Sequence, residues 1–173
     1  MVEYYNCILS KRVKIITLLG SLMILFLILI TFIHLLIAIK AINIEKILCL
    51  LFIEIMFITL YALSIIFSPR FIYCRTDYFE LNCFFYLKRF FYAEINSCKR
   101  VYLSSNDVRL FGSNGIWGYI GYLDNGQHRY YSFANNEKEL LEIEYRGRFY
   151  LISCENSLLF QKTINEKRII KDL

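Results

Sequence analysis

The amino-acid sequence predicts an α+β protein in which a transmembrane helical hairpin precedes a rolled antiparallel β-sheet, and one C-terminal α-helix caps that sheet. Three observations support this prediction. Residues 15–39 and 47–67 form two long apolar runs. Short segments rich in Tyr, Phe, Ile and Val follow them, which is typical of half-buried strands. The last segment, from residue 156 onward, places apolar side chains at helical spacing.

The two apolar runs are each long enough to cross a bilayer, which takes roughly 20 residues. The chain has 173 residues, 57% of them hydrophobic, and a mean hydropathy of +0.44, so it is too apolar for an ordinary soluble domain. A cleaved signal peptide is the alternative for the first run, but the apolar core of such a peptide is only about 7–15 residues long. Two membrane-spanning helices are therefore expected.

The link between the helices, residues 40–46, is short, so residues 15–67 should form an antiparallel hairpin with both ends on one side of the membrane. Three basic residues lie in the lead-in 1–14, against two in the link. Because basic residues favour the cytoplasmic side, this difference predicts that both termini and the soluble domain are cytoplasmic.

Residues 70–173 form the expected soluble domain, after Pro69 ends the membrane part. Asn125-Gly126 predicts a hairpin with a type I′ turn, and Arg146-Gly147 predicts a second hairpin. The candidate strands are 71–76, 78–83, 84–91, 99–104, 107–112, 116–123, 128–134, 140–145 and 148–153.

Two patterns near the C-terminus indicate which side chains are buried. Glu142 and Glu144 alternate with apolar residues along one candidate strand, which predicts a buried face and a solvated face carrying the two glutamates. A helix should begin near residues 156–157 and bury Phe160 and Ile164.

Residues 109–122 hold four of the seven glycines and the only tryptophan. The segment lacks the spacing of a phosphate-binding loop. One interpretation is structural, a bulged strand pair or wide turn where glycine relieves crowding. The other is a recognition loop in which Trp117 meets a partner or the membrane interface. The candidate recognition residues are Arg109, Phe111, Gly112, Gly115, Trp117, Gly118, Tyr119 and Gly121.

Two ionisable side chains lie within the predicted spans, His34 in the first and Glu54 in the second. Counted outward from the link, their depths differ by only ~3 Å, so a contact across the hairpin is expected. Such a pair would lock the hairpin, or Glu54 would join neighbouring subunits. A proton or ion pathway is the alternative, because intramembrane carboxylates are costly and often functional.

Two basic pairs in the soluble domain are candidate contacts for anionic lipid headgroups: Lys88 with Arg89, and Lys99 with Arg100. The alternative is ordinary solvated charge. Residues 70–173 carry 15 basic and 12 acidic side chains, so the charge that nucleic-acid binding requires is missing.

Catalytic signatures are not evident. None of the six cysteines forms a C-x-x-C pair, and His128 is the single histidine of the soluble part. Reduced cysteines that fill the core are the simplest interpretation. We therefore expect no enzymatic activity, no metal and no cofactor.

Several segments together resemble the pleckstrin-homology (PH) superfold, and more specifically the bacterial PH-domain proteins that carry two N-terminal membrane helices. The segments that carry the resemblance are 78–81, 91–95, 99–101, 109–122 and 150–153 with Phe160. The chain departs from that subgroup at 154–157, where prolines are common. The resemblance implies a non-catalytic, membrane-tethered module of the bacterial inner membrane.

The function expected from these observations is interaction or scaffolding at the membrane. The partners would be the bilayer and either a partner protein, bound at a sheet edge or the glycine-rich segment by strand addition, or a second copy of the chain. The alternatives are a small subunit of a membrane transport or signalling complex, and a sensor of anionic lipid headgroups.

Overall fold

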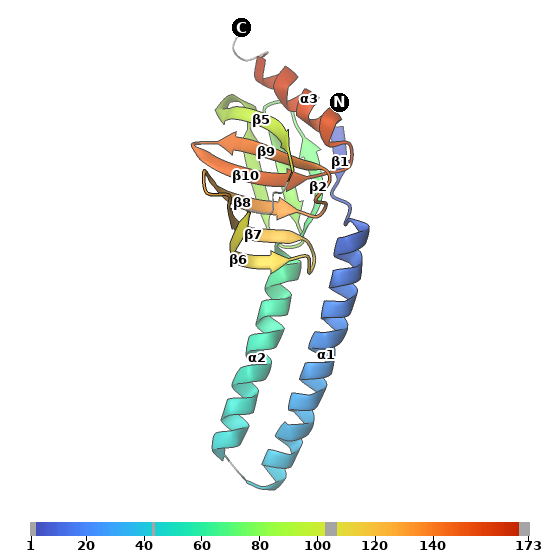
Figure 1. Cartoon of the computed structure of the whole chain (residues 1–173), viewed down its shortest axis with the longest axis vertical. Coiled ribbons are helices and arrows are strands. Elements are labelled where there is room, and N and C mark those ends of the chain that lie inside the picture. Colours follow the sequence, from blue (N-terminus) through green and yellow to red (C-terminus); the bar gives the residue numbers. More distant parts are fainter. Residues whose placement is uncertain (1–2, 43, 103–106, 170–173) are drawn as a thin grey trace.

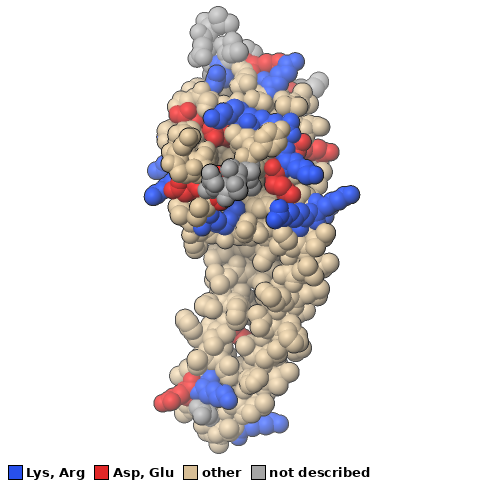
Figure 2. Space-filling view, in the orientation of Figure 1, with Lys and Arg blue, Asp and Glu red and all other residues tan. Residues whose placement is uncertain are grey.

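The computed structural model describes residues 3–42, 44–102 and 107–169, and confirms the α+β class (Figure 1). Two antiparallel helices, α1 (Lys11–Lys40) and α2 (Ile44–Ile66), project from a β-rich domain. Both are long and apolar enough to cross a membrane. Charged side chains gather on the domain and at the far end of the helix pair, and the surface between them is almost free of charge (Figure 2).

The helices are longer than the apolar runs, so their connection is reduced from the predicted 40–46 to residues 41–43. Ser10 caps α1, because its side chain accepts a hydrogen bond from the Val13 amide (3.3 Å), and the helix therefore begins before the apolar run. This shorter connection changes which residues of α1 and α2 lie level with one another.

A four-stranded antiparallel sheet has the order β1-β2-β3-β4. Its strands are β1 (Glu3–Asn6), β2 (Pro69–Cys74), β3 (Tyr78–Cys83) and β4 (Leu87–Phe91). A short 3-10 helix, η1 (Tyr92–Glu94), leads from β4 into the second sheet. Strand β1 was not predicted from the sequence, and it places part of the lead-in 1–14 beside the strand that follows α2.

The six-stranded sheet has the order β5-β9-β10-β8-β7-β6. Its strands are β5 (Ile95–Val101), β6 (Val108–Asn114), β7 (Tyr119–Asp124), β8 (Arg129–Ala134), β9 (Leu140–Tyr145) and β10 (Arg148–Ser153). Residues 103–104 of the predicted strand 99–104 lie outside the described residues, as do 1–2 and 170–173. The sheet is mixed, not wholly antiparallel, because β10 returns from its hairpin and pairs in parallel with β8.

The second predicted hairpin is confirmed, and the first has a different turn. Arg146 and Gly147 both have positive φ (51° and 70°), as a two-residue type I′ turn requires. The β7–β8 connection instead spans four residues, in which only Gly126 has positive φ. The Asn125 side chain accepts from the amides of Gln127 and His128, so this asparagine stabilises the wider turn with ordinary φ.

The main core lies between the two sheets and the C-terminal helix α3 (Ser157–Ile169). Phe160 and Ile164 are fully buried there, as predicted. Tyr5 of β1 also packs on the Phe160 ring (5.0 Å between centroids), and its hydroxyl lies 3.0 Å from Thr163 Oγ1. The N-terminal strand thus completes the core of a domain whose other strands all follow the helices.

Candidate functional sites

The glycine-rich segment forms the antiparallel pair β6–β7 and the turn between these strands. A register shift between Arg109 and Phe111 marks a bulge, and Gly112 lies directly opposite Gly121. A Cβ atom on Gly112 would lie 2.0 Å from the Ile120 carbonyl oxygen. The two glycines therefore allow the strands to approach more closely than side chains permit.

The turn of this hairpin contacts α1 and the segment just after α2. Thr17 Oγ1 of α1 donates to the Gly115 carbonyl (3.2 Å) and accepts from the Trp117 amide (2.8 Å). Ser68, just after α2, donates to the Trp117 carbonyl (2.8 Å). Ile116 packs over Gly20, since a Cβ on Gly20 would lie 2.9 Å from Ile116 Cδ1. The segment is the place where the domain docks on the helix pair.

A buried asparagine reinforces this junction. Asn135 is 1% exposed, and its Nδ2 donates to the carbonyls of Cys7 (2.9 Å) and Pro69 (2.5 Å). Cys7 leads toward α1, and Pro69 begins β2 directly after α2. Asn135 therefore ties both chain crossings between helices and domain to the end of β8.

The predicted recognition residues of the segment have different environments. The Arg109 guanidinium donates to the carbonyls of Ser113 and Ile120, and burial lowers the pKa of this arginine. Tyr119 is buried and Trp117 is half-buried, whereas Phe111 is 69% exposed. Arg109 thus holds the hairpin together. Recognition by the segment stays a prediction.

The four basic candidates all interact within the domain. Lys88 donates to the Tyr150 hydroxyl (2.9 Å). The ion pairs are Arg89–Glu80 (2.8 Å), Lys99–Glu142 (2.9 Å) and Arg100–Glu139 (3.2 Å). Lys99 and Arg100 lie on β5, the edge of the sheet opposite β6. A lipid headgroup would compete with these partners, and the lipid role of the four side chains stays a prediction.

The expected contact between His34 and Glu54 is not formed. Glu54 Oε1 accepts from Thr31 Oγ1 (3.4 Å), and His34 Nδ1 lies 2.9 Å from the Ile30 carbonyl of its own helix. The short connection explains the difference. Glu54 lies ten residues after the first residue of α2. On α1, Thr31 lies nine residues before the last residue and His34 lies only six before it, so Thr31 is closer to the level of Glu54. Thus the polar partner of Glu54 is a hydroxyl.

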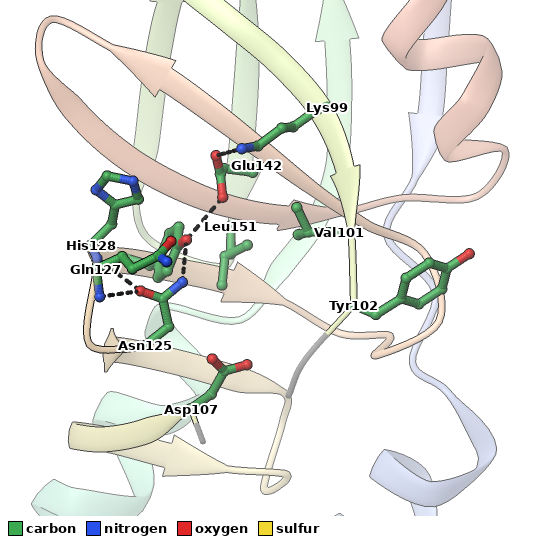
Figure 3. Close-up of a pocket in the computed structure, with 10 residues that line it drawn as sticks. Lys99, Val101, Tyr102, Asp107, Asn125, Gln127, His128, Glu142 and Leu151 are labelled. Atoms are coloured by element: carbon green, nitrogen blue, oxygen red, sulfur yellow. Dashed lines mark hydrogen bonds and ion pairs between the residues drawn. The ribbon is translucent and has the colours of Figure 1, made fainter. Parts of the chain in front are cut away.

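The sequence did not predict a cavity of about 340 Å³ on the face of the six-stranded sheet that points away from the main core (Figure 3). Glu142 lies in its floor and is 3% exposed, contrary to the predicted solvated position. Its carboxylate accepts from Lys99 Nζ (2.9 Å) and the Tyr130 hydroxyl (2.9 Å). Its burial comes from its neighbours on the same sheet, because Lys99 lies directly opposite Glu142 on β5 and Tyr130 reaches it from β8 (Figure 3).

The cavity has a polar network and an aromatic rim. Asn125 Nδ2 donates to the Tyr130 hydroxyl (2.8 Å), and His128 stacks on Phe149 (4.1 Å between centroids). Burial and the neighbouring Glu142 raise the pKa of Tyr130, which therefore remains a hydrogen-bond donor. Tyr102 also lines the cavity, is 71% exposed, and its ring points away from Glu142 and Asn125 (Figure 3). Among the described lining residues there is no Ser, Thr or Cys.

Five of the six cysteines are buried thiols. The environment of one of them, Cys74, predicts how the free energy of unfolding depends on pH. Burial raises the pKa of Cys74 to about 11, from an ordinary 9.0. The folded chain thus holds this proton when the unfolded chain has lost it, and the stabilisation present below pH 9 is lost as the pH rises from 9 to 11. We expect about 2–3 kcal/mol of destabilisation from this thiol.

Chemical unfolding of the full chain in detergent at pH 8 and at pH 11 measures this effect. Cys49, which is exposed on α2, provides the control position. The pH dependence should shrink in the Cys74→Ala chain and persist in the Cys49→Ala chain. Equal pH dependence in both variants would mean that the Cys74 thiol does not titrate as described.

Comparison with known proteins identifies the class. A family model described as a bacterial PH domain matches residues 71–168, which is more than half of the chain. The chain therefore belongs to the bacterial PH domain family, and in it the domain follows two long apolar helices. Comparisons with curated proteins and with solved structures find no match.

Proposed function

We propose that this protein is a non-catalytic interaction or scaffolding module that its helical hairpin holds at the bacterial inner membrane, with the domain in the cytoplasm. The observation that carries the proposal is the direct docking of the domain on α1 and on the segment just after α2, through Thr17 and Ser68 to the turn at 115–117. A domain docked in this way presents the same surface in every copy, as a scaffold requires.

The cavity is the surface that best suits a protein partner. Its volume lies within the range of about 300–1,000 Å³ that is typical of binding pockets. Leu151 and Val101 supply apolar floor, and Lys99 and Asp107 supply charges of both signs, so an extended polypeptide with polar side chains fits it. Both Glu142 oxygens are already bonded, which supports a binding role over catalysis.

Site-specific photo-crosslinking in native membranes tests this proposal. A photoreactive residue at Tyr102 should give one discrete adduct with another protein, and Gln127→Trp, which fills the cavity, should abolish it. The control is the same residue at Lys162 on α3, an exposed position away from the cavity. Adducts only between copies of this chain, or the same adduct from both positions, would contradict a partner at the cavity.

A further inference from the structure

Two turns of the domain contact the helices where these helices meet the domain. The β3–β4 turn contacts α2, because the Phe85 amide donates to the Ile66 carbonyl (3.4 Å). The β6–β7 turn contacts α1, because Ile116 packs over Gly20. The two turns come from different sheets.

The lengths of the two helices indicate the depth of these turns relative to the membrane. Lys40, Glu45 and Lys46 are the charged residues at the far end of the pair, and about 20 helical residues cross ~30 Å of hydrocarbon. Counting 20 residues back from Lys40 reaches Gly20, and counting 20 forward from Lys46 reaches Ile66. These are the two residues that the turns contact, so both turns lie at the same hydrocarbon boundary.

Exposed aromatic side chains lie on the first turn and on the second hairpin. Phe84 is 48% exposed and Phe85 is 78% exposed on the first turn. On the second hairpin Phe111 is 69% exposed, whereas Ile116 and Trp117 are half-buried and the Trp117 indole nitrogen is buried. Large exposed aromatic side chains near the ends of α1 and α2 that meet the domain are unfavourable in water and favourable at a membrane interface.

The charges next to the turns match a lipid surface. Exposed Lys11, Arg12 and Lys14 lie on α1 at least six residues, or about 9 Å, beyond Gly20, at the level of the headgroups. The guanidinium of the exposed Arg70 lies 4.8 Å from the Phe84 ring centroid, so a cation is placed directly beside this turn. Lipid phosphates would pair with these cations.

We propose that the β3–β4 and β6–β7 turns form a second membrane contact of this protein, in which Phe84, Phe85, Ile116 and Trp117 lie in the interfacial layer of the bilayer. The inference goes beyond the proposed function, because it assigns lipid, not a protein, to the face around the helices. It rests on both helices spanning the membrane.

Depth-dependent quenching of tryptophan fluorescence tests the inference in the full chain, reconstituted in phosphatidylcholine vesicles with brominated acyl chains. The native Trp117 is the only tryptophan, so the unmodified chain is the first sample. Brominated lipid should quench it strongly, and aqueous iodide should quench it weakly. Tryptophans at other positions are introduced one at a time into the Trp117→Phe chain. Phe85→Trp reports on the other turn, and Leu159→Trp on α3 is a control far from α1 and α2.

The Phe85→Trp chain should behave like the unmodified chain, and the Leu159→Trp chain should show the reverse quenching pattern. If Phe85→Trp and native Trp117 are as accessible to iodide as Leu159→Trp, the inference is wrong. Phe52→Trp, an exposed position inside α2, separates the causes. Lipid quenching there together with iodide access at the turns overturns only the interfacial contact, whereas iodide access at all positions overturns the membrane insertion as well.

Discussion

Replacing Gly112 with alanine is expected to destabilise the protein by about 3–5 kcal/mol and to disrupt the β6–β7 hairpin. The added Cβ would lie 2.0 Å from the Ile120 carbonyl oxygen and 2.8 Å from the Gly121 Cα, which are backbone atoms that cannot rotate away. The φ of Gly112, 114°, adds strain for any residue with a Cβ. The midpoint of thermal unfolding of the full chain in detergent measures the loss.

Gly126→Ala is the matched control for this prediction. Gly126 also has positive φ (81°), but nothing lies within 4 Å of the position that a Cβ would occupy. Only the conformational cost of about 1–2 kcal/mol remains. Similar losses for Gly112→Ala and Gly126→Ala would contradict the close approach of β6 and β7.

Replacing Thr17 with valine is the second large effect that we expect. The substitution keeps the shape of the side chain, but it removes the acceptor of the Trp117 amide and the donor to the Gly115 carbonyl. Because Thr17 is only 7% exposed, these backbone groups are left without a partner, which costs about 1–3 kcal/mol for each one that water cannot reach. Faster hydrogen exchange at the Trp117 amide and a lower unfolding midpoint report the loss.

Thr31→Val tests whether the effect is specific to the docking site. The Thr31 hydroxyl donates to the carbonyls of Leu27 and Ile28 within α1 and to Glu54 of α2, so its removal affects the helix pair and leaves no amide of the docking site without an acceptor. We expect unchanged exchange at Trp117 in this chain. An equal response to both threonine substitutions would show that Thr17 contributes only to α1 itself.

The elements that were predicted correctly depend on local sequence patterns. Long apolar runs define the two helices, the period of 3.6 places Phe160 and Ile164 on the buried face of α3, and Arg146-Gly147 specifies a tight hairpin. The bacterial PH family was also recognisable from the sequence, mainly from its glycine-rich segment. These features need little information from distant parts of the chain.

The features that were missed depend on contacts between distant residues. Glu3–Asn6 becomes a strand only because it pairs with residues 71–74, which follow both helices in the sequence. Glu142 alternates like a solvated residue, yet Lys99 of β5 and Tyr130 of β8 contact its carboxylate and bury it. Thr31, not His34, contacts Glu54, because the connection between the helices is shorter than the segment from Lys40 to Lys46 that was expected to form it.

The central claim is that the domain is docked on the helix pair through its glycine-rich hairpin, and disulfide crosslinking in isolated native membranes tests it most directly. Gly20→Cys combined with Ile116→Cys should form an intramolecular disulfide under mild oxidation, since a Cβ on Gly20 would lie 3.1 Å from Ile116 Cγ1. Ser21 faces Tyr61 of α2 (2.8 Å between the hydroxyls), so Ser21→Cys with Ile116→Cys should not crosslink. Crosslinking of both pairs, or of neither, would contradict the docked arrangement.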